Sequence, residues 1–314
     1  MEGTGKKRAP LERERGVGQK EKARLAFVGT IEAGADRELR ELIETLRRRD
    51  FEVEVRIAWE KGQAEEYARR AGEEGVDAVV ACGGDGTLFE VINGVVGLSR
   101  APMVAGLPFG TGNDFLRSLG IEPSQGSMEF LSWLNREPTR IDLGRLGERY
   151  FLNMATAGVG AEITTETSRE FKNLAGRLAY LAGALPKILD RRSTIARIEA
   201  RDFVWEGELA FLFIGNGIQA GGGWQISPAA RLNDGLLDLV VVPEASLPEL
   251  LRGRQAIVES EAPGDYGEIR YRQIPRVMIE WEEPLAMNLD GEPVEVGTRV
   301  EVEVVSEAIS FLIP

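Results

Sequence analysis

Two glycine-rich segments, each placed after an apolar run, are the strongest sign of chemistry in this chain. GGDGT at 83–87 follows the run 79–81, and FGTGND at 109–114 follows the run 103–107. A helix that begins at such a segment presents free backbone N–H groups and the positive end of its dipole, and glycine lets an anion approach the backbone closely. We therefore interpret both segments as phosphate-binding loops; a simple turn is the alternative for either one alone.

The familiar nucleotide-binding signatures do not account for these glycines. The chain has no G-x-x-x-x-G-K-[ST] and no well-placed G-x-G-x-x-G, which excludes a P-loop and a dinucleotide fold. Asn113 precedes an apolar stretch and is predicted to cap a helix with its side chain. A different nucleotide-binding architecture is therefore required.

Two Asp-Gly pairs offer carboxylates for metal binding or proton transfer. The chain contains no histidine, so Ser-His-Asp and Cys-His sites are excluded and proton transfer must use Asp, Glu, Lys or Tyr. LNDGLLDL at 232–239 and NLDGEP at 288–293 each fit a hairpin turn as well as a functional loop. In the second segment, Asp290 and Glu292 form a close pair that suits base catalysis.

The first part of the chain, 25–137, alternates strand-like and helix-like patterns. Apolar residues within 36–49 recur at i, i+3, i+4 and i+7, as on one face of a helix, whereas 51–59 alternates with period two. Such alternation predicts a three-layer α/β domain with a parallel sheet, whose ligands bind at the carboxyl ends of the strands. Helices are expected at 36–49, 64–75, 87–97 and 127–137.

The second part, 138–306, consists of alternating or apolar runs joined by Gly, Asn and Asp turns, which predicts an antiparallel β-sandwich. One helical insertion is expected at about 167–190. Residues 307–314 are expected to pack back on the first domain. Residues 1–24 are charged and have no apolar segment, so we expect a disordered tail rather than a secretion signal.

Composition limits the compartment and the partners. One cysteine, Cys82, excludes an internal disulfide, and no apolar run approaches the roughly 18 residues of a spanning helix. The net charge of −13 argues against nucleic acid as a partner. We expect a cytoplasmic protein, peripheral at the inner face of the membrane, and the composition leaves its oligomeric state open.

With GGDGT followed by LPFGTGNDF, the sequence resembles the diacylglycerol kinase catalytic-domain superfamily, and looks closest to its bacterial YegS-type lipid kinases. The similarity continues through FLNMATAGVGAEITTET, LNDGLLDL and NLDGEPV, so it covers nearly everything in 25–314. The resemblance implies ATP in a cleft between an α/β domain and a β-sandwich. It also implies that a lipid hydroxyl, of the phosphatidylglycerol or diacylglycerol class, is the phosphate acceptor.

By the same resemblance, the nucleotide is held at the ends of the first strands and by both glycine loops. The threonine that the family often has at the end of the second strand is Ala58 here, and the first-strand loop VGTIEAG departs from the family pattern. The implied nucleotide-binding positions are Thr30, Ala58, Gly83, Gly84, Asp85, Gly86, Thr87, Leu88, Phe89 and Thr111.

Metal and base positions also follow from the resemblance. The Asp234 carboxylate and the backbone carbonyls of Arg231 and Leu236 would bind one Mg²⁺, a hard cation that takes oxygen ligands. A second Mg²⁺ bridging ATP oxygens is expected for phosphoryl transfer. The family's base lies in NLDGEP; we favour Glu292, with Asp290 as its partner or as the alternative base. Asp85 is a third catalytic candidate, expected to be an exposed loop carboxylate directed at phosphates or their Mg²⁺.

The acceptor side has a basic segment at 168–192, which is notable in an acidic chain because anionic lipid attracts such segments. An amphipathic helix packed on the sandwich, with its basic face in water, is the alternative. Two rival functions remain. An NAD kinase shares GGDGT but not LPFGTGNDF or LNDGLLDL, and a catalytically silent protein could bind a nucleotide or a lipid without turnover.

Overall fold

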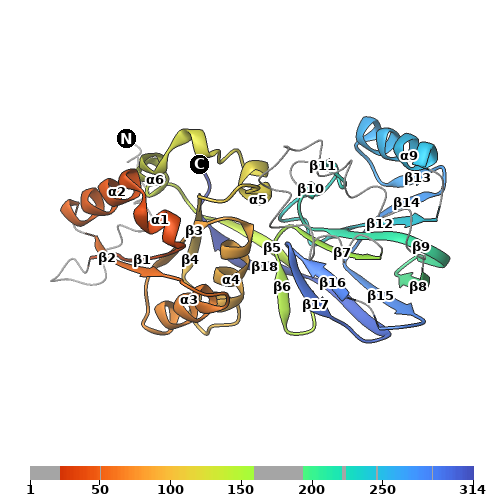
Figure 1. The fold of residues 1–314 in the computed structure, drawn as a ribbon, viewed down its shortest axis with the longest axis horizontal. Coiled ribbons are helices and arrows are strands. Elements are labelled where there is room, and N and C mark those ends of the chain that lie inside the picture. The colour runs from red at the N-terminus through yellow and green to blue at the C-terminus, as the bar shows by residue number, and fades with distance from the viewer. Residues whose placement is uncertain (1–21, 50, 159–193, 221–223, 245–246, 285) are drawn as a thin grey trace, which may run out of the picture. The chain divides into compact units, whose positions relative to one another are not determined.

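The computed structural model describes residues 22–49, 51–158, 194–220, 224–244, 247–284 and 286–314. The chain divides into two compact units, mostly red to yellow and mostly yellow-green to blue in Figure 1. One unit runs to Ile141 and takes in Ala308–Pro314, and the other comprises Asp142–Glu307. The predicted helical insertion, the basic segment at 168–192 and most of the expected tail lie outside the described residues.

The first unit is built on a parallel sheet with strand order β4-β3-β1-β2. The end of β18 (Arg299–Phe311) joins it in parallel, with Phe311 opposite Val104. Layers cover the inner strands on both sides, which is why β1 and β3 are almost wholly buried apolar runs. The other strands of this sheet are β1 (Arg24–Gly29), β2 (Glu52–Ile57), β3 (Ala78–Gly83) and β4 (Met103–Pro108).

Helices cover both faces of this sheet (Figure 1). The connection from β1 to β2 and the connection from β2 to β3 run in opposite directions along the sheet, so right-handed crossovers place α2 on one face and α3 on the other. Gly94 of α4 lies against the Glu65 carbonyl of α3, so these two helices approach closely on their shared face. The helices are α1 (Ile31–Ala35), α2 (Arg37–Arg48), α3 (Gln63–Glu73), α4 (Asp85–Val95), α5 (Asp114–Ser118) and α6 (Phe130–Trp133), with 3-10 turns η1 (Pro123–Gln125) and η2 (Ser127–Glu129).

The second unit is antiparallel, with strand order β13-β14-β12-β9-β8-β15-β18. β9 also pairs with β7. β7 pairs in turn with β16, and β16 pairs with β17. The predicted fold class, a parallel α/β domain with an antiparallel β-sandwich, is confirmed. The elements of this unit are β5 (Thr139–Leu146), β6 (Arg149–Phe151), β7 (Met154–Gly158), β8 (Thr194–Ala200), β9 (Phe203–Gly215), β10 (Gln219–Ala220), β11 (Trp224–Gln225), β12 (Leu237–Pro243), α9 (Leu247–Ser260), β13 (Gly264–Tyr266), β14 (Ile269–Ile274), β15 (Arg276–Trp281), β16 (Ala286–Leu289) and β17 (Glu292–Glu295).

One expected helix is shorter than predicted, and one helix was not predicted. The predicted helix at 127–137 is reduced to η2 and the single turn α6, where Phe130 and Trp133 are buried and meet edge to face. That aromatic contact, together with Phe27 of β1 against Phe130, fixes the segment through tertiary packing rather than helix length. Helix α9 was not predicted. Its Ile257 is buried in the second unit's core, so tertiary contacts stabilise this helix as well.

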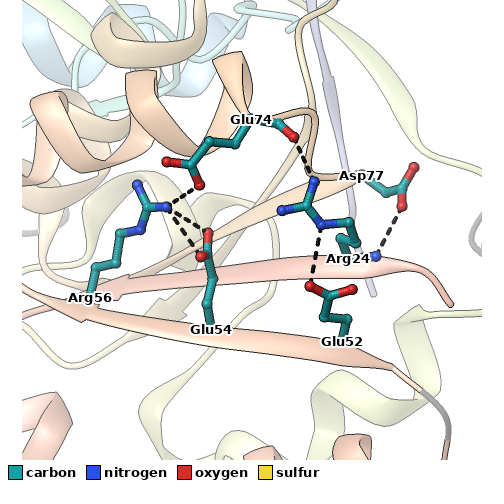
Figure 2. Close-up of polar contacts among 6 residues, drawn as sticks. All are labelled: Arg24, Glu52, Glu54, Arg56, Glu74 and Asp77. Carbon is teal, nitrogen blue, oxygen red and sulfur yellow. Dashed lines mark hydrogen bonds and ion pairs between the residues drawn. The ribbon is translucent and has the colours of Figure 1, made fainter.

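An ion-pair network fastens the edge strand β2 to its neighbours (Figure 2). The Arg56 guanidinium contacts Glu54 at 3.1 Å and Glu74 at 2.5 Å, and it donates to the Tyr67 carbonyl of α3 at 3.0 Å. Charged side chains on an edge strand also discourage pairing with another chain. The network therefore holds β2 against α3, the helix that follows it in the chain.

Candidate active site

A continuous row of backbone hydrogen bonds crosses the carboxyl edge of the parallel sheet. The N–H of Ala58 donates to the Gly29 carbonyl at 2.8 Å, and that of Thr30 donates to the Cys82 carbonyl at 3.1 Å. On the far side, the N–H of Phe109 donates to the Gly83 carbonyl at 2.9 Å. The row brings the ends of β2, β1, β3 and β4 together, and with them the positions predicted to hold the nucleotide.

The row includes the point where the chain direction reverses. Connections leave β1 toward β2 and leave β3 toward β4, so the ends of β1 and β3 flank the switch point at which open α/β sheets bind ligands. Thr30 lies on one side of that point and the GGDGT segment on the other. The glycines therefore lie at the place where sheets of this topology bind their ligands.

The two glycine loops contact each other directly. A Cβ on Gly84 would lie 3.1 Å from the Gly110 Cα, and a Cβ on Gly110 would overlap the Gly84 Cα. Backbone therefore meets backbone here, which only glycine permits. The glycines therefore allow the two loops to touch. Phosphate binding at the first turn of α4 stays a prediction.

Asn113 does not cap α5 with its side chain, contrary to the prediction. It has a left-handed backbone, with φ of 54°, and is completely buried. Its amide nitrogen donates to the Gly110 carbonyl at 2.7 Å, and its amide oxygen accepts the Gly110 N–H at 3.1 Å. Asn113 thus closes the second glycine loop on itself.

Asp85 takes the capping role instead. Its carboxylate accepts the backbone N–H groups of Asp114 at 3.2 Å and Phe115 at 3.3 Å. Burial, with the neighbouring charge of Asp114, raises the pKa of Asp85 above its ordinary value. The expectation of an exposed carboxylate is therefore wrong, because the side chain is half-buried against the start of α5.

The remaining predicted nucleotide positions differ in what they can offer. Leu88 and Phe89 are buried, so their side chains belong to the core and only their backbone lies near the loop. Thr111 is exposed, and Thr30 accepts the Ala33 N–H at 3.3 Å as the cap of α1. The first N–H groups of the eleven-residue helix α4 have no carbonyl partner within the helix. They are the part of this edge best suited to phosphate.

In the second unit, the Asn-Asp-Gly segment is not a hairpin turn between paired strands. β11 pairs with β10, whereas β12 pairs with β9 and β14. The segment is fixed by buried Asp142, whose carboxylate accepts the Gly235 N–H at 2.7 Å and whose own N–H donates to the Leu232 carbonyl at 2.6 Å. Sequence reasoning missed Asp142, because its partner lies 93 residues away along the chain.

The donor set of this segment suits a hard cation. Asp234 is exposed, and one of its oxygens accepts the Leu236 N–H at 3.1 Å, so the carboxylate lies over a tight turn. Within the described ranges, no three Asp, Glu, Cys or His side chains gather closely enough to bind a metal. A Mg²⁺ here would therefore need backbone carbonyls and water besides Asp234, which is an ordinary Mg²⁺ environment.

A buried acid lies just beyond this turn. The Tyr271 hydroxyl donates to the Asp238 carboxylate and itself accepts the Ala229 N–H at 3.1 Å. Burial is the main cause that raises the pKa of Asp238 to about 7, and the nearby charge of Asp234 adds to it. The pair ties the segment before the turn to β14.

Asp290 and Gly291 do form a two-residue hairpin turn. Leu289 pairs with Glu292 across β16 and β17, and both turn residues have positive φ, 51° and 97°. The Asp290 carboxylate accepts three backbone N–H groups at 2.6–2.9 Å, from Leu152, Asn153 and Met154. The segment is therefore a hairpin turn, and its Asp290 side chain also holds the start of β7. A turn at this place does not exclude a functional role for the segment.

Glu292 differs from Asp290 in its surroundings. It is the first residue of β17, is only partly buried, and lies two residues from a carboxylate whose oxygens hold backbone amides. The two acids of NLDGEP therefore differ in role. Asp290 accepts hydrogen bonds from backbone N–H groups, whereas Glu292 begins β17.

Comparison with known proteins agrees with this architecture. The diacylglycerol kinase catalytic domain matches residues 31–146, and the YegS C-terminal NAD kinase beta sandwich-like domain matches residues 153–313. The chain therefore belongs to the diacylglycerol kinase catalytic-domain family, in its YegS-like branch. Membership makes it a kinase, that is, a phosphotransferase.

Full-length relatives share most of the chain. A probable lipid kinase YegS-like from Pseudomonas aeruginosa is 37% identical over 297 residues, covering 94% of this chain and 95% of the relative. A probable lipid kinase YegS-like from Alcanivorax borkumensis is 36% identical over 272 residues, covering 85% and 89%. A crystal structure of a diacylglycerol kinase from Bacillus anthracis has a TM-score of 0.70 at 21% identity, covering 95% of this chain and 98% of that one, and supports the fold alone.

No helix within the described ranges has the length and apolar character that crossing a bilayer requires.

Proposed function

We propose that the protein is an ATP-dependent lipid kinase that transfers the γ-phosphate of ATP to a lipid hydroxyl of the phosphatidylglycerol or diacylglycerol class. The observation that carries the proposal is the pair of glycine loops in contact at the carboxyl edge, at Gly84 and Gly110, beside the start of α4. Relatives that cover most of the chain are described as probable lipid kinases. An NAD kinase and a catalytically silent binding protein are the rivals.

The first unit supplies the nucleotide site. Backbone N–H groups at the start of α4 would bind phosphate oxygens, and Thr30 and Thr111 would add hydroxyls beside them. Asp85 would hold α5 and the second glycine loop in place, since its oxygens are turned to the amides of Asp114 and Phe115. Ala58 adds no hydroxyl at its position.

The second unit supplies the proton acceptor. Glu292 would take the proton of the lipid hydroxyl as the oxygen attacks the γ-phosphorus, while the bond from that phosphorus to the β-bridging oxygen breaks and ADP leaves. Asp290 would act as a positioning residue, because three backbone N–H groups occupy its carboxylate.

Mg²⁺ would be held by the Asp234 carboxylate with the carbonyls of Arg231 and Leu236. A Mg²⁺ bound with ATP would neutralise charge that develops on the phosphate oxygens. Asp142 would keep the metal turn in shape through Gly235. We further propose that the protein acts in the cytoplasm and touches the membrane only peripherally, since its acceptor lies in a lipid surface.

A transfer assay tests the function. The protein is incubated with Mg²⁺ and γ-labelled ATP against phosphatidylglycerol, diacylglycerol and a sphingoid base in mixed micelles, and against NAD. Label in a lipid is the expected result. Label in NAD alone would make the protein an NAD kinase, and ATP binding without any labelled product would make it a silent binding protein.

A further inference from the structure

Trp59 lies one residue beyond Ala58, whose N–H belongs to the row of backbone hydrogen bonds at the strand ends. Trp59 is the second residue after the end of β2, and 71% of its surface is exposed, the highest value among the large hydrophobic residues of the described chain. The Ala58 N–H donates a hydrogen bond to the Gly29 carbonyl at the end of β1. The Thr30 N–H, just after β1, donates to the Cys82 carbonyl of β3. Trp59 therefore lies at the β2 end of the same edge that carries the glycine loops.

The loop that presents Trp59 is fixed at several points. The N–H of Trp59 donates to the Gln63 side chain at 2.8 Å, and the Glu90 carboxylate of α4 accepts the N–H groups of Gly62 at 2.8 Å and Ala64 at 3.0 Å. Arg56 fastens the strand before the loop to the helix after it (Figure 2). A rigid loop thus holds a large aromatic side chain in water.

Exposing a tryptophan from a fixed loop sacrifices the favourable burial of its ring, so a partner that covers it would recover that free energy. The described chain leaves most of this residue uncovered. Helix α1, however, lies over the end of β2, because a Cβ on Gly34 would be 2.9 Å from the Ile57 side chain. Ile31, at the start of α1, is 47% exposed and adds apolar surface at the same edge.

We propose that Trp59 stacks on the base of the bound nucleotide and makes the first unit prefer a nucleotide over bare phosphate. This inference rests on the proposed ATP-dependent function and deepens it. β2 lies two strands from β3, about 10 Å at ordinary strand spacing, so a nucleotide with its phosphates at Gly83–Thr87 would extend its base along the row toward β2.

Stacking also compensates for the missing hydroxyl at Ala58. A base presents a flat apolar face that an indole covers well, and removing one such contact weakens binding roughly five- to hundredfold. The same ring inserted in a membrane is the competing explanation, since tryptophan favours the boundary between water and lipid. Trp59 lies at the end of the row of predicted nucleotide-binding positions, which favours contact with the base over insertion in a membrane.

The test compares ATP with inorganic tripolyphosphate, which has the phosphates without the base. Calorimetric affinities for both, with Mg²⁺, are measured for the wild type, Trp59→Ala and Trp59→Phe. We expect Trp59→Ala to bind ATP at least fivefold more weakly and tripolyphosphate as the wild type does, and Trp59→Phe to recover most of the ATP affinity. Val204→Ala, at another exposed apolar position, is the matched control and should change neither.

Unchanged ATP affinity in Trp59→Ala would overturn the inference. So would equal weakening of both ligands, because the loop would then act on the phosphate site. Loss of sedimentation with phosphatidylglycerol vesicles at unchanged ATP affinity would assign Trp59 to the membrane instead. A wild type that binds ATP but labels no lipid would remove the proposed function and leave the base contact intact, whereas a wild type that does not bind ATP would overturn both.

Discussion

Oδ2 of Asp85 accepts the backbone N–H of Asp114 at 3.2 Å, so the first residue of α4 caps the next helix of the same sheet edge. The two glycine loops are therefore not independent turns. One acid joins them, and its removal should be felt in both stability and nucleotide binding.

Asp85→Ala should lower the free energy of unfolding by about 1 kcal/mol, the usual cost of losing a helix cap, and should abolish phosphate transfer. Urea denaturation measures the first effect and the labelled-ATP assay the second. Asp85→Asn keeps one acceptor oxygen and should recover part of the stability. Near-normal transfer in Asp85→Ala would remove Asp85 from the site.

The contact between the loops predicts an order of severity for glycine substitutions. Gly110→Ala should prevent the loops from closing and should weaken ATP binding more than Gly84→Ala, whose added Cβ meets the neighbouring Cα at 3.1 Å rather than overlapping it. Gly120→Ala, at a positive-φ position with no atom near the new Cβ, reports the backbone strain alone. Equal ATP affinities for all three variants, measured by calorimetry, would contradict the contact.

Asp234→Ala should lower activity and melting temperature together in Mg²⁺, because a bound ion stabilises only the folded state. Asn233→Ala, at the exposed neighbouring position, is the matched control. Melting curves with Mg²⁺ and with a chelator separate the two variants. If Mg²⁺ leaves the wild-type melting temperature unchanged, the segment is a turn without a metal.

Glu292→Gln should slow turnover by roughly 10²–10⁴-fold with little change in ATP affinity or stability, because a general base acts only in proton transfer. Asp290→Asn should instead lower stability as well as turnover, since it disturbs three backbone hydrogen bonds. Rapid turnover by Glu292→Gln, with Asp290→Asn folded normally but inactive at saturating Mg²⁺ and ATP, would reverse the assignment.

Cys82 should be inert in the folded protein. Burial raises the pKa of its thiol above the ordinary value of 9.0, so the folded state keeps a proton that the unfolded state loses at alkaline pH. The free energy of unfolding should therefore fall as pH rises above about 9, by up to about 1.4 kcal/mol per pH unit. Cys82→Ala should remove the contribution of this thiol, while buried Tyr271, whose pKa is also raised, continues to contribute above about pH 10. Fast labelling of the native thiol at pH 7 would contradict its burial.

Local pattern was sufficient for the parts of the fold that obey one period. The apolar face of α2 and the existence of strand β2 follow from side-chain periodicity, and the glycine loops after apolar runs indicated the edge at which we propose the nucleotide site. Family resemblance then indicated which acids to examine. These features depend on residues close together in the chain, which is why the sequence determined them.

Contacts between distant residues needed the tertiary structure. Asp142 meets Gly235 and Glu307, Asp290 holds Leu152, and Asp85 rather than Asn113 caps α5. In each case a carboxylate that is at least partly buried is paired with backbone amides that no local pattern brings near it. The sequence by itself determined the class of enzyme and the chemical groups available to it, whereas only the tertiary structure decided which of those groups shape the backbone, because a hydrogen bond depends on where the chain returns.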